Sequence, residues 1–343
     1  MDPTNSKTVS ADSSKTDRAT ASGQQGLVFW LYRLLRVREA FIVAILLVLI
    51  VIMSFISPGF RSEANFRAVL LGFAMEGIVV VGMTILLVSG GFDLSVGANM
   101  ALTGMVTASL MRAHVSISMA VLAGLGTAAV VGLLNAWLVA NIGVNALIAT
   151  LGTMTILRGV ALTVWEGRPV SQVPDAFRGL GQGVFLGIPL PAVILIVLMV
   201  VFDILMRRGR WFRQLYFVGS SERAARLSGI NVTRVRVITY VIAGILAGLA
   251  GIVSTSRLSA AYPNSYDQTA LRVISGAVIG GCSLFGGEGS VIGSVLGLFF
   301  ISLILDIGVL MGVSPYIQGI VQGVALILAV VVDIWSKRQM VRR

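Results

Sequence analysis

Residues 40–57 read AFIVAILLVLIVIMSFIS, a run of eighteen positions without a single charged side chain. The hydrocarbon core of a bilayer is about 30 Å thick, and an α-helix needs about 20 predominantly apolar residues to cross it. The stretch therefore predicts a membrane-spanning helix.

Nine further apolar runs follow, and together they decide the fold class. The 343-residue chain is 56% hydrophobic and 12% charged, with a mean hydropathy of +0.93. An average soluble protein is about 25% charged, and a disordered chain is poor in apolar residues, so both classes are excluded. We predict an all-α polytopic membrane protein with about ten transmembrane helices. The runs lie at 40–57, 68–88, 95–111, 115–140, 144–164, 184–206, 235–255, 271–284, 290–306 and 315–335.

Residue types that build metal and redox sites are scarce. Cys282 is the only cysteine and His114 the only histidine, which excludes an intramolecular disulfide and cysteine-cluster or multi-histidine metal sites. A phosphate-binding loop needs a glycine before Lys-Ser or Lys-Thr, and Lys7, Lys15 and Lys337 all follow serine. No nucleophile elbow or zinc motif is present either. We expect no enzyme activity, no metal and no cofactor in this chain.

The basic residues are distributed unevenly along a chain of net charge +11. Because they lie between apolar runs, they indicate membrane topology rather than nucleic-acid binding. Ten spans place both termini on one side, which then carries 18 of the 26 basic residues, against seven on the other. Basic loops stay in the cytoplasm. We therefore predict a disordered cytoplasmic tail at 1–38, a transmembrane domain at 39–336 with a cytoplasmic loop at 207–236, and a cytoplasmic tail at 337–343.

Two glycine-rich segments interrupt the apolar runs: SGGFDLSVG at 89–97 and GGCSLFGGEGS at 280–290. Non-helical backbone at membrane depth must be buried in protein or line a wet cavity. Paired breaks of this kind are typical of transport paths. The second to fifth and the seventh to tenth runs start on opposite sides of the membrane, so a repeat of the two halves would be an inverted repeat. The alternative is that both are tight cytoplasmic turns, because Gly-Gly is a common turn signal. The candidate path residues are Glu76, Gly90, Gly91, Phe92, Asp93, Ser95, Asn99, Gly280 and Gly281.

Ionisable side chains inside the apolar runs are costly and are therefore candidates for function. Glu76 is the deepest acid, and we predict that Arg158 pairs with it across the bundle. Asp203 precedes Arg207 by four residues, which suits a local ion pair. Asp93 begins a helix, where the dipole favours a carboxylate. The candidates for membrane-embedded ionisable groups are Glu76, Asp93, Arg158, Asp203 and Asp306, the last at an outer helix end where we expect a structural role.

The 207–236 loop contains a short predicted helix in the sequence GSSERAARLSGI at 219–230. Ser220 or Ser221 can cap its N-terminus, Glu222 suits its first turn, and Gly229 suits its C-terminal cap. A two-turn helix is unstable alone, so it needs a docking surface on its own membrane domain or on a partner. Its candidate coupling residues are Gly219, Glu222, Arg223, Ala224, Ala225, Arg226, Leu227 and Gly229, with Ala224, Ala225 and Leu227 forming an apolar face and Arg223 and Arg226 its rim.

Four blocks occur in order across the membrane domain: GGFDLSVG at 90–97, ATLGTMTILRG at 149–159, AARLSGINV at 224–232 and VIGGCSLFGG at 278–287. Together they resemble the signature of ribose-type sugar ABC importer permeases. The resemblance implies a type II importer permease in the bacterial inner membrane. It implies as partners a cytoplasmic ABC ATPase that binds the ATP, a periplasmic sugar-binding protein, and a second permease copy or paralogue. It also implies that the 219–230 helix docks into the ATPase.

The chain departs from the family pattern just before the second Gly-Gly pair. The family usually reads Glu-Leu-Asp-Ala-Ile-Ala there, whereas residues 270–275 read ALRVIS. Arg272 thus occupies a usually acidic position at the outer end of the eighth run. The change indicates either an altered substrate or a salt bridge moved onto another subunit.

These observations predict the permease subunit of an ATP-driven importer for a monosaccharide or related polyol. A neutral sugar needs no counter-charge, in keeping with the few charges inside the membrane. The alternative is a proton-coupled secondary transporter that uses Glu76 or Asp93 as its relay. A membrane enzyme is disfavoured because no catalytic constellation is present.

Overall fold

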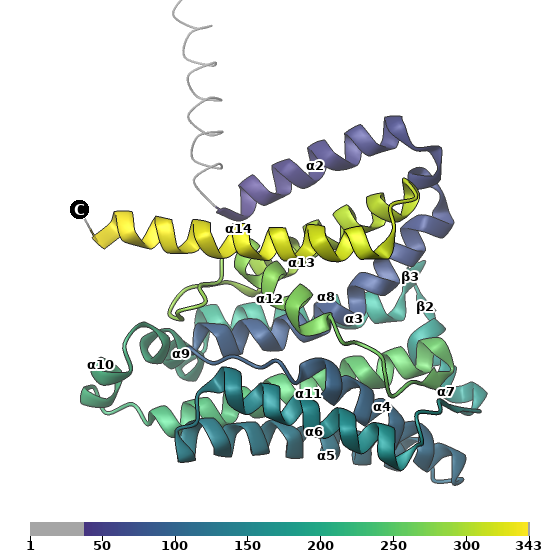
Figure 1. Ribbon diagram of the computed structural model, residues 1–343, viewed down its shortest axis with the longest axis horizontal. Coiled ribbons are helices and arrows are strands. Elements are labelled where there is room, and N and C mark those ends of the chain that lie inside the picture. The colour runs from purple at the N-terminus through teal and green to yellow at the C-terminus, as the bar shows by residue number, and fades with distance from the viewer. Residues whose placement is uncertain (1–37, 342–343) are drawn as a thin grey trace, which may run out of the picture.

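The computed structural model describes residues 38–341 and shows a bundle of long, roughly parallel helices (Figure 1). Most of the predicted N-terminal tail lies outside the described residues. The helices are α2 (Arg38–Ile56), η1 (Pro58–Arg61), α3 (Glu63–Val88), α4 (Val96–Arg112), α5 (Ile117–Ala136), η2 (Trp137–Ile142), α6 (Ala146–Val164), α7 (Asp175–Gln182), α8 (Leu190–Arg208), α9 (Arg210–Ser220), α10 (Glu222–Leu227), α11 (Val232–Leu258), α12 (Thr269–Ile279), α13 (Val291–Leu310) and α14 (Pro315–Val341). Four two-residue strands pair antiparallel, β1 (Val170–Ser171) with β4 (Ala260–Ala261) and β2 (Val184–Phe185) with β3 (Ile188–Pro189).

Each predicted apolar run overlaps a helix, and the fourth run covers both α5 and most of η2. This confirms the all-α polytopic class. Among the described residues, eight helices are long and apolar enough to cross a membrane, while α4 and α12, with 17 and 11 residues, are shorter. The sixth run differs at its start. Leu186 and Gly187 have φ angles of 51° and 81°, the left-handed pair that closes a two-residue hairpin. Residues 184–189 therefore form β2 and β3, and α8 begins at Leu190.

The two ends of the bundle carry different elements. Helices α9 and α10 lie at the left in Figure 1, whereas α7 and the β2–β3 hairpin lie at the right. The start of α2 and the end of α14 both lie toward the α9–α10 end. The described chain therefore begins and ends on one side, as an even number of spans requires.

Helices α3 and α11 form the buried centre of the bundle, and α11 packs against α3, α4 and α5. Glycines allow the closest approach. A Cβ atom on Gly132 of α5 would lie 2.7 Å from the carbonyl oxygen of Tyr240, and one on Gly244 of α11 would lie 2.8 Å from that of Ala128. Small residues at such crossings let membrane helices pack through their backbones.

Helices α2 and α14 lie on one flank of the bundle (Figure 1). Their outward side chains are apolar, as at Phe55, which is 84% exposed, and Ile320, which is 65% exposed. Such surfaces suit contact with lipid, because hydrocarbon tails have no polar groups to pair with them.

Helices α3–α6 and helices α11–α14 have a similar order of lengths. The first three helices of each set are long, short and long: α3, α4 and α5 have 26, 17 and 20 residues, and α11, α12 and α13 have 27, 11 and 20. The glycine breaks fall at different steps of that order. The first break joins α3 to α4, and the second joins α12 to α13. The breaks are therefore not equivalent to each other, and the inverted repeat stays a prediction.

Candidate functional site

Three glycines from distant parts of the chain meet at the α9 end of the bundle. Gly90 lies between α3 and α4, Gly219 lies in the last turn of α9, and Gly286 lies between α12 and α13. A Cβ atom on Gly286 would lie 2.9 Å from the Cα atoms of both Gly90 and Gly219. Gly90 and Gly286 have φ angles of 77° and 84°, a region that glycine enters without a steric penalty. We call this three-way contact the glycine junction.

Hydrogen bonds hold the glycine junction together. The amide of Gly287 donates to the carbonyl oxygen of Val88 over 2.9 Å, which joins the second break to the end of α3. The hydroxyl of Tyr216 on α9 donates to the carbonyl oxygen of Gly289 over 3.0 Å. Helix α9 is therefore attached to both breaks. Both segments therefore meet beside α9 at the end of α3, and their role in the transport path stays a prediction.

The acid of the first break is enclosed by the protein. Asp93 is 1% exposed, and its Oδ1 accepts hydrogen bonds from the amide and the hydroxyl of Ser95 over 2.7 and 2.6 Å. The amide nitrogen of Asn135 on α5 donates to Asp93 Oδ2 over 3.3 Å. Asn99 donates to the carbonyl oxygen of Gly244 over 3.1 Å. In this chain these predicted path residues hold α4, α5 and α11 together.

The rest of the first break is held through its backbone. The amide of Gly91 donates to Leu86 over 2.9 Å, and the hydroxyl of Tyr240 donates to the carbonyl oxygen of Phe92 over 2.9 Å. In the second break, a Cβ atom on Gly280 would lie 2.6 Å from the Cα atom of Ser294 on α13. These contacts are internal, and none of these residues lines the cavity between α3 and α13 that Glu76 lines.

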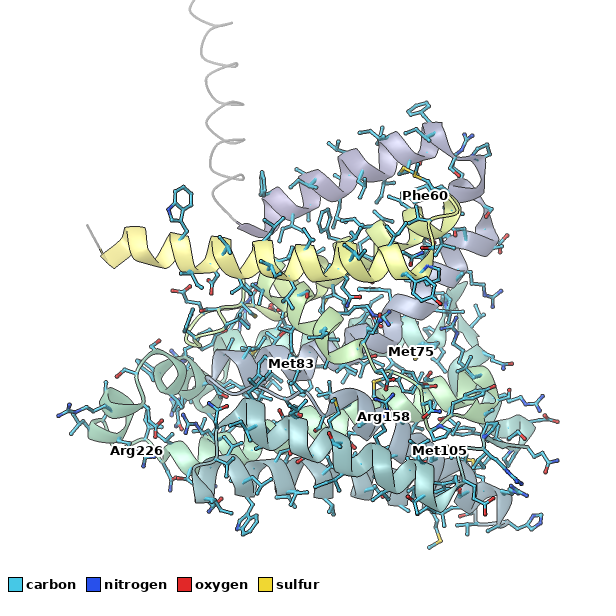
Figure 2. The ribbon with its side chains drawn as sticks, viewed as in Figure 1. Phe60, Met75, Met83, Met105, Arg158 and Arg226 are labelled. Atoms are coloured by element: carbon cyan, nitrogen blue, oxygen red, sulfur yellow. The ribbon has the colours of Figure 1, made fainter. Side chains whose placement is uncertain are left out.

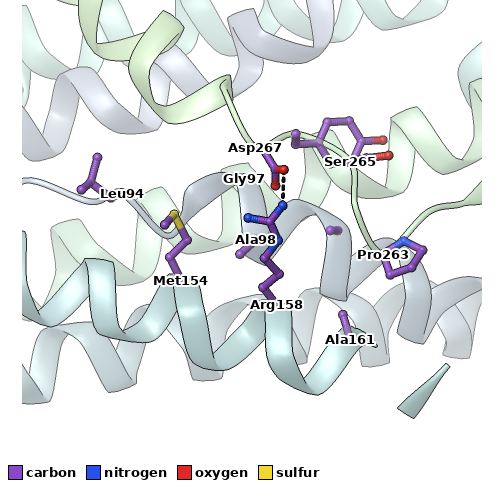
Figure 3. A pocket seen from close by; sticks show the side chains of 11 residues that line it. Leu94, Gly97, Ala98, Met154, Arg158, Ala161, Pro263, Ser265 and Asp267 are labelled. Atoms are coloured by element: carbon purple, nitrogen blue, oxygen red, sulfur yellow. Dashed lines mark hydrogen bonds and ion pairs between the residues drawn. The ribbon is translucent and has the colours of Figure 1, made fainter. Parts of the chain in front are cut away.

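The predicted pairing of Glu76 with Arg158 is wrong. Glu76 on α3 instead pairs with Arg272 on α12, with 2.8 Å between Oε1 and Nη1. Arg158 on α6 pairs with Asp267, which lies in the segment before α12, and Figure 3 shows the two side chains facing each other across a small pocket. Helix α12 rather than α6 packs against α3, so Arg272 is the arginine within reach of Glu76. Arg272 thus has an ion-pair partner within its own chain.

Two other acids behave as predicted. Asp203 pairs with Arg207 one turn along α8, with 2.6 Å between Oδ2 and Nε. Asp306 accepts a hydrogen bond from the side-chain amide of Asn65 over 3.0 Å, which joins α13 to the start of α3. Among the described residues no three His, Cys, Asp or Glu side chains are grouped as metal ligands would be.

Helix α10 has the predicted start and stop. Ser221 is the N-cap, and its hydroxyl accepts from the amide of Ala224, while Gly229 after the helix has a φ of 78°. Glu222 accepts from Arg226 and, across to α11, from Arg236, each over 2.7 Å. The hydrogen bond from Arg226, together with the charges of both arginines, holds the pKa of the Glu222 carboxyl below its usual range. Arg226 projects from the extreme α10 end of the molecule in Figure 2.

The prediction that Ala225 belongs to the outward apolar face is wrong. Ala225 is 2% exposed and packs into the main core of this chain. Leu227 is 83% exposed, and Arg223 and Ala224 are also exposed. Gly219 likewise lies inside, in the glycine junction. Helix α10 thus docks on its own membrane domain through one side and presents Leu227 outward on another.

A family model described as branched-chain amino acid transport system / permease component matches residues 65–330. The chain belongs to this family of transport permeases. The permease is 39% identical to the ribose import permease protein RbsC of Escherichia coli (strain K12) over 298 residues, which cover 86% of this chain and 92% of that one. It is 37% identical to the ribose import permease protein RbsC of Bacillus subtilis (strain 168) over 84% of this chain and 90% of that one. It is 34% identical to the L-arabinose ABC transporter permease protein AraH of Azospirillum brasilense over 87% and 88%. No solved structure matches the permease significantly.

Membership of this family makes the chain a bacterial membrane permease and not an enzyme. The sequence analysis missed three positions that the structure brings to the site: Asn135, Thr150 and Tyr216. Asn135 and Thr150 are fully buried polar residues, and Thr150 accepts from the amide of Leu94 over 3.0 Å. A polar residue inside an apolar run was the available signal for both, while nothing in the sequence marks Tyr216.

Proposed function

We propose that the permease is the membrane subunit of an ATP-driven importer for a monosaccharide or related polyol. The relatives named above carry ribose or L-arabinose in their names, although the family description refers to branched-chain amino acids. The sugar assignment follows the relatives because their similarity extends over most of each chain. Residues 39–336 form the transmembrane domain, which needs no cofactor of its own.

The proposed importer has the α9–α10 end of the bundle in the cytoplasm, together with both termini. The 18-to-seven distribution of basic residues supports this orientation. The partners are then a cytoplasmic ABC ATPase at the α10 end, a periplasmic sugar-binding protein at the α7 end, and a second permease copy or paralogue. ATP binds to the ATPase subunit.

The observation that carries the coupling role is the glycine junction next to an exposed helix. Leu227 offers an apolar contact that nothing in the described chain covers. Gly219 lies three residues before the first residue of α10 and contacts both glycine-rich breaks. A shift of α10 imposed by the ATPase would thus displace the ends of α3 and α13 together. The fully buried Asp93 and the ion-paired Glu76 give no comparable support to the proton-relay alternative.

Leu227→Glu tests the docking face, because it places an unpaired charge in the contact. We expect at least a tenfold loss of ATPase co-purification and of uptake, with the permease still folded. Leu186→Glu is the matched control, since Leu186 is 86% exposed at the opposite end, and it should keep the ATPase. Arg223→Ala should have a small effect, because exposed ion pairs contribute only about 0–1 kcal/mol. If Leu227→Glu binds the ATPase and takes up sugar like the wild type, α10 does not dock on the ATPase through Leu227. If uptake continues without the ATPase, the permease is not part of an ATP-driven importer.

A further inference from the structure

A cavity of about 370 Å³ opens between α3, α12, α13 and α14. It lies along the first half of α3, remote from the glycine junction. Ligand pockets typically measure about 300–1,000 Å³ and combine mostly apolar walls with a few polar groups. Phe73, Leu305 and Val309 are among the apolar lining residues here, and Glu76, Arg272 and Asp306 supply the charges. The cavity therefore has the size and the composition of a small-molecule site.

The polar groups in the cavity are held in place by contacts within the chain. Arg272 is fixed by its 2.8 Å ion pair with Glu76, and the two side chains are 30% and 14% exposed. Asp306 is oriented by its hydrogen bond from Asn65. Gln318 at the start of α14 donates to the carbonyl oxygen of Val313 over 3.0 Å. Groups held in this way can present hydrogen-bonding atoms to a ligand without first being ordered.

We propose that this cavity is a binding site for an uncharged polyhydroxy solute, an inference that rests on the importer function proposed above. The lining carries two carboxylates and one guanidinium, so its formal charge is negative. An anionic solute would meet Asp306 while the guanidinium is already engaged by Glu76. Hydroxyl groups of an uncharged polyol can donate to the carboxylates and accept from the guanidinium and the Gln318 amide. The apolar wall then faces the carbon atoms of the solute.

Arg272 determines the charge of the site. With an acid at position 272, the cavity would hold three carboxylates and no guanidinium. Arginine there neutralises Glu76 and adds several N–H donors. Arg272 therefore reduces the negative charge of the cavity and supplies its guanidinium donors.

Thiol labelling tests whether the cavity is wet and takes the solute. Gln318→Cys and Ile320→Cys are compared in the intact importer with a charged, membrane-impermeant thiol reagent added from the outer side. Ile320 lies two residues along α14, is 65% exposed and does not line the cavity. We expect position 318 to react at least tenfold faster than position 320. Saturating D-ribose or L-arabinose should slow that reaction, whereas the matching aldonic acid and D-glucosamine should not.

Asp306→Asn tests the polar contact in transport. Asparagine keeps an acceptor oxygen but loses the negative charge, and a charge-assisted hydrogen bond is roughly twice as strong as a neutral one, so we expect KM for the sugar to rise roughly fivefold. Arg272→Lys should keep the preference for the uncharged sugar, because it keeps the charge.

Several results would overturn the site. One is equal labelling of positions 318 and 320, and another is protection by the aldonic acid or the amino sugar in place of the sugar. An unchanged KM in Asp306→Asn would also reject the site. Each of these results can occur while wild-type uptake still requires the ATPase, so a failure of the site is distinguishable from a failure of the importer function.

Discussion

Gly219→Ala is the sharpest test of the glycine junction. The added methyl group would lie less than 3.0 Å from the carbonyl oxygen of Val88 and from the amide of Gly287, a separation that real Cβ atoms essentially never show. Both neighbours are backbone atoms, so no flexible side chain can move aside. Overpacking of this kind costs about 1–3 kcal/mol.

The same methyl group separates the Gly287 amide from the Val88 carbonyl, which now form a 2.9 Å hydrogen bond. Losing that hydrogen bond costs about 1 kcal/mol more. The total destabilisation of the glycine junction is then roughly 2–4 kcal/mol. This corresponds to a shift of roughly 30- to 700-fold in the equilibrium between joined and separated loops. The outward surface of α10 is unchanged, so the ATPase should still bind.

The assay measures sugar uptake and ATP hydrolysis in the same proteoliposomes, together with the melting temperature of the permease. We expect Gly219→Ala to lower the sugar transported per ATP at least tenfold and to lower the melting temperature. Gly126→Ala is the matched control, because a Cβ atom on this helical glycine of α5 meets nothing within 4 Å. It should leave transport intact. If Gly219→Ala transports and melts like Gly126→Ala, the glycine junction does not link α9 to the two breaks.

Two further predictions concern topology and charge. Ser228→Cys should resist an impermeant thiol reagent in intact cells while Asp175→Cys at the α7 end reacts. The wild type, whose Cys282 is buried, is the control, and labelling of Ser228→Cys from outside would reverse the orientation. The pKa of Glu222 is depressed chiefly by the hydrogen bond from Arg226. The ion pairs of Glu222 are therefore fully present above the usual range of a glutamate and are lost only as the pH falls through the depressed value. A carbon-13 NMR titration should show Glu222 titrating below the other glutamates and moving upward in Arg226→Ala, and no movement would contradict the assigned cause.

Local features of the chain were predictable from the sequence because their causes are local. A run such as 40–57 contains too few polar groups for water and is long enough for a bilayer. Ser221 and Gly229 mark the ends of α10, since capping depends on a side chain and on φ within a few residues. Asp203 and Arg207 meet because they are one helical turn apart. The family resemblance rests on equally local blocks, and the family comparison confirmed it.

Contacts between distant segments were decided only by the tertiary structure. The apolar runs contain more than one arginine that could pair with Glu76. Because α12 rather than α6 packs against α3, Arg272 is its partner. Ala225 and Leu227 are both apolar residues on one short helix, and only the docking of α10 buries the first and exposes the second. The sequence shows Gly90, Gly219 and Gly286 as three separate turn or helix-end signals. Their contact exists because the packing of α3, α9 and α13 brings three backbones closer than any side chain would allow.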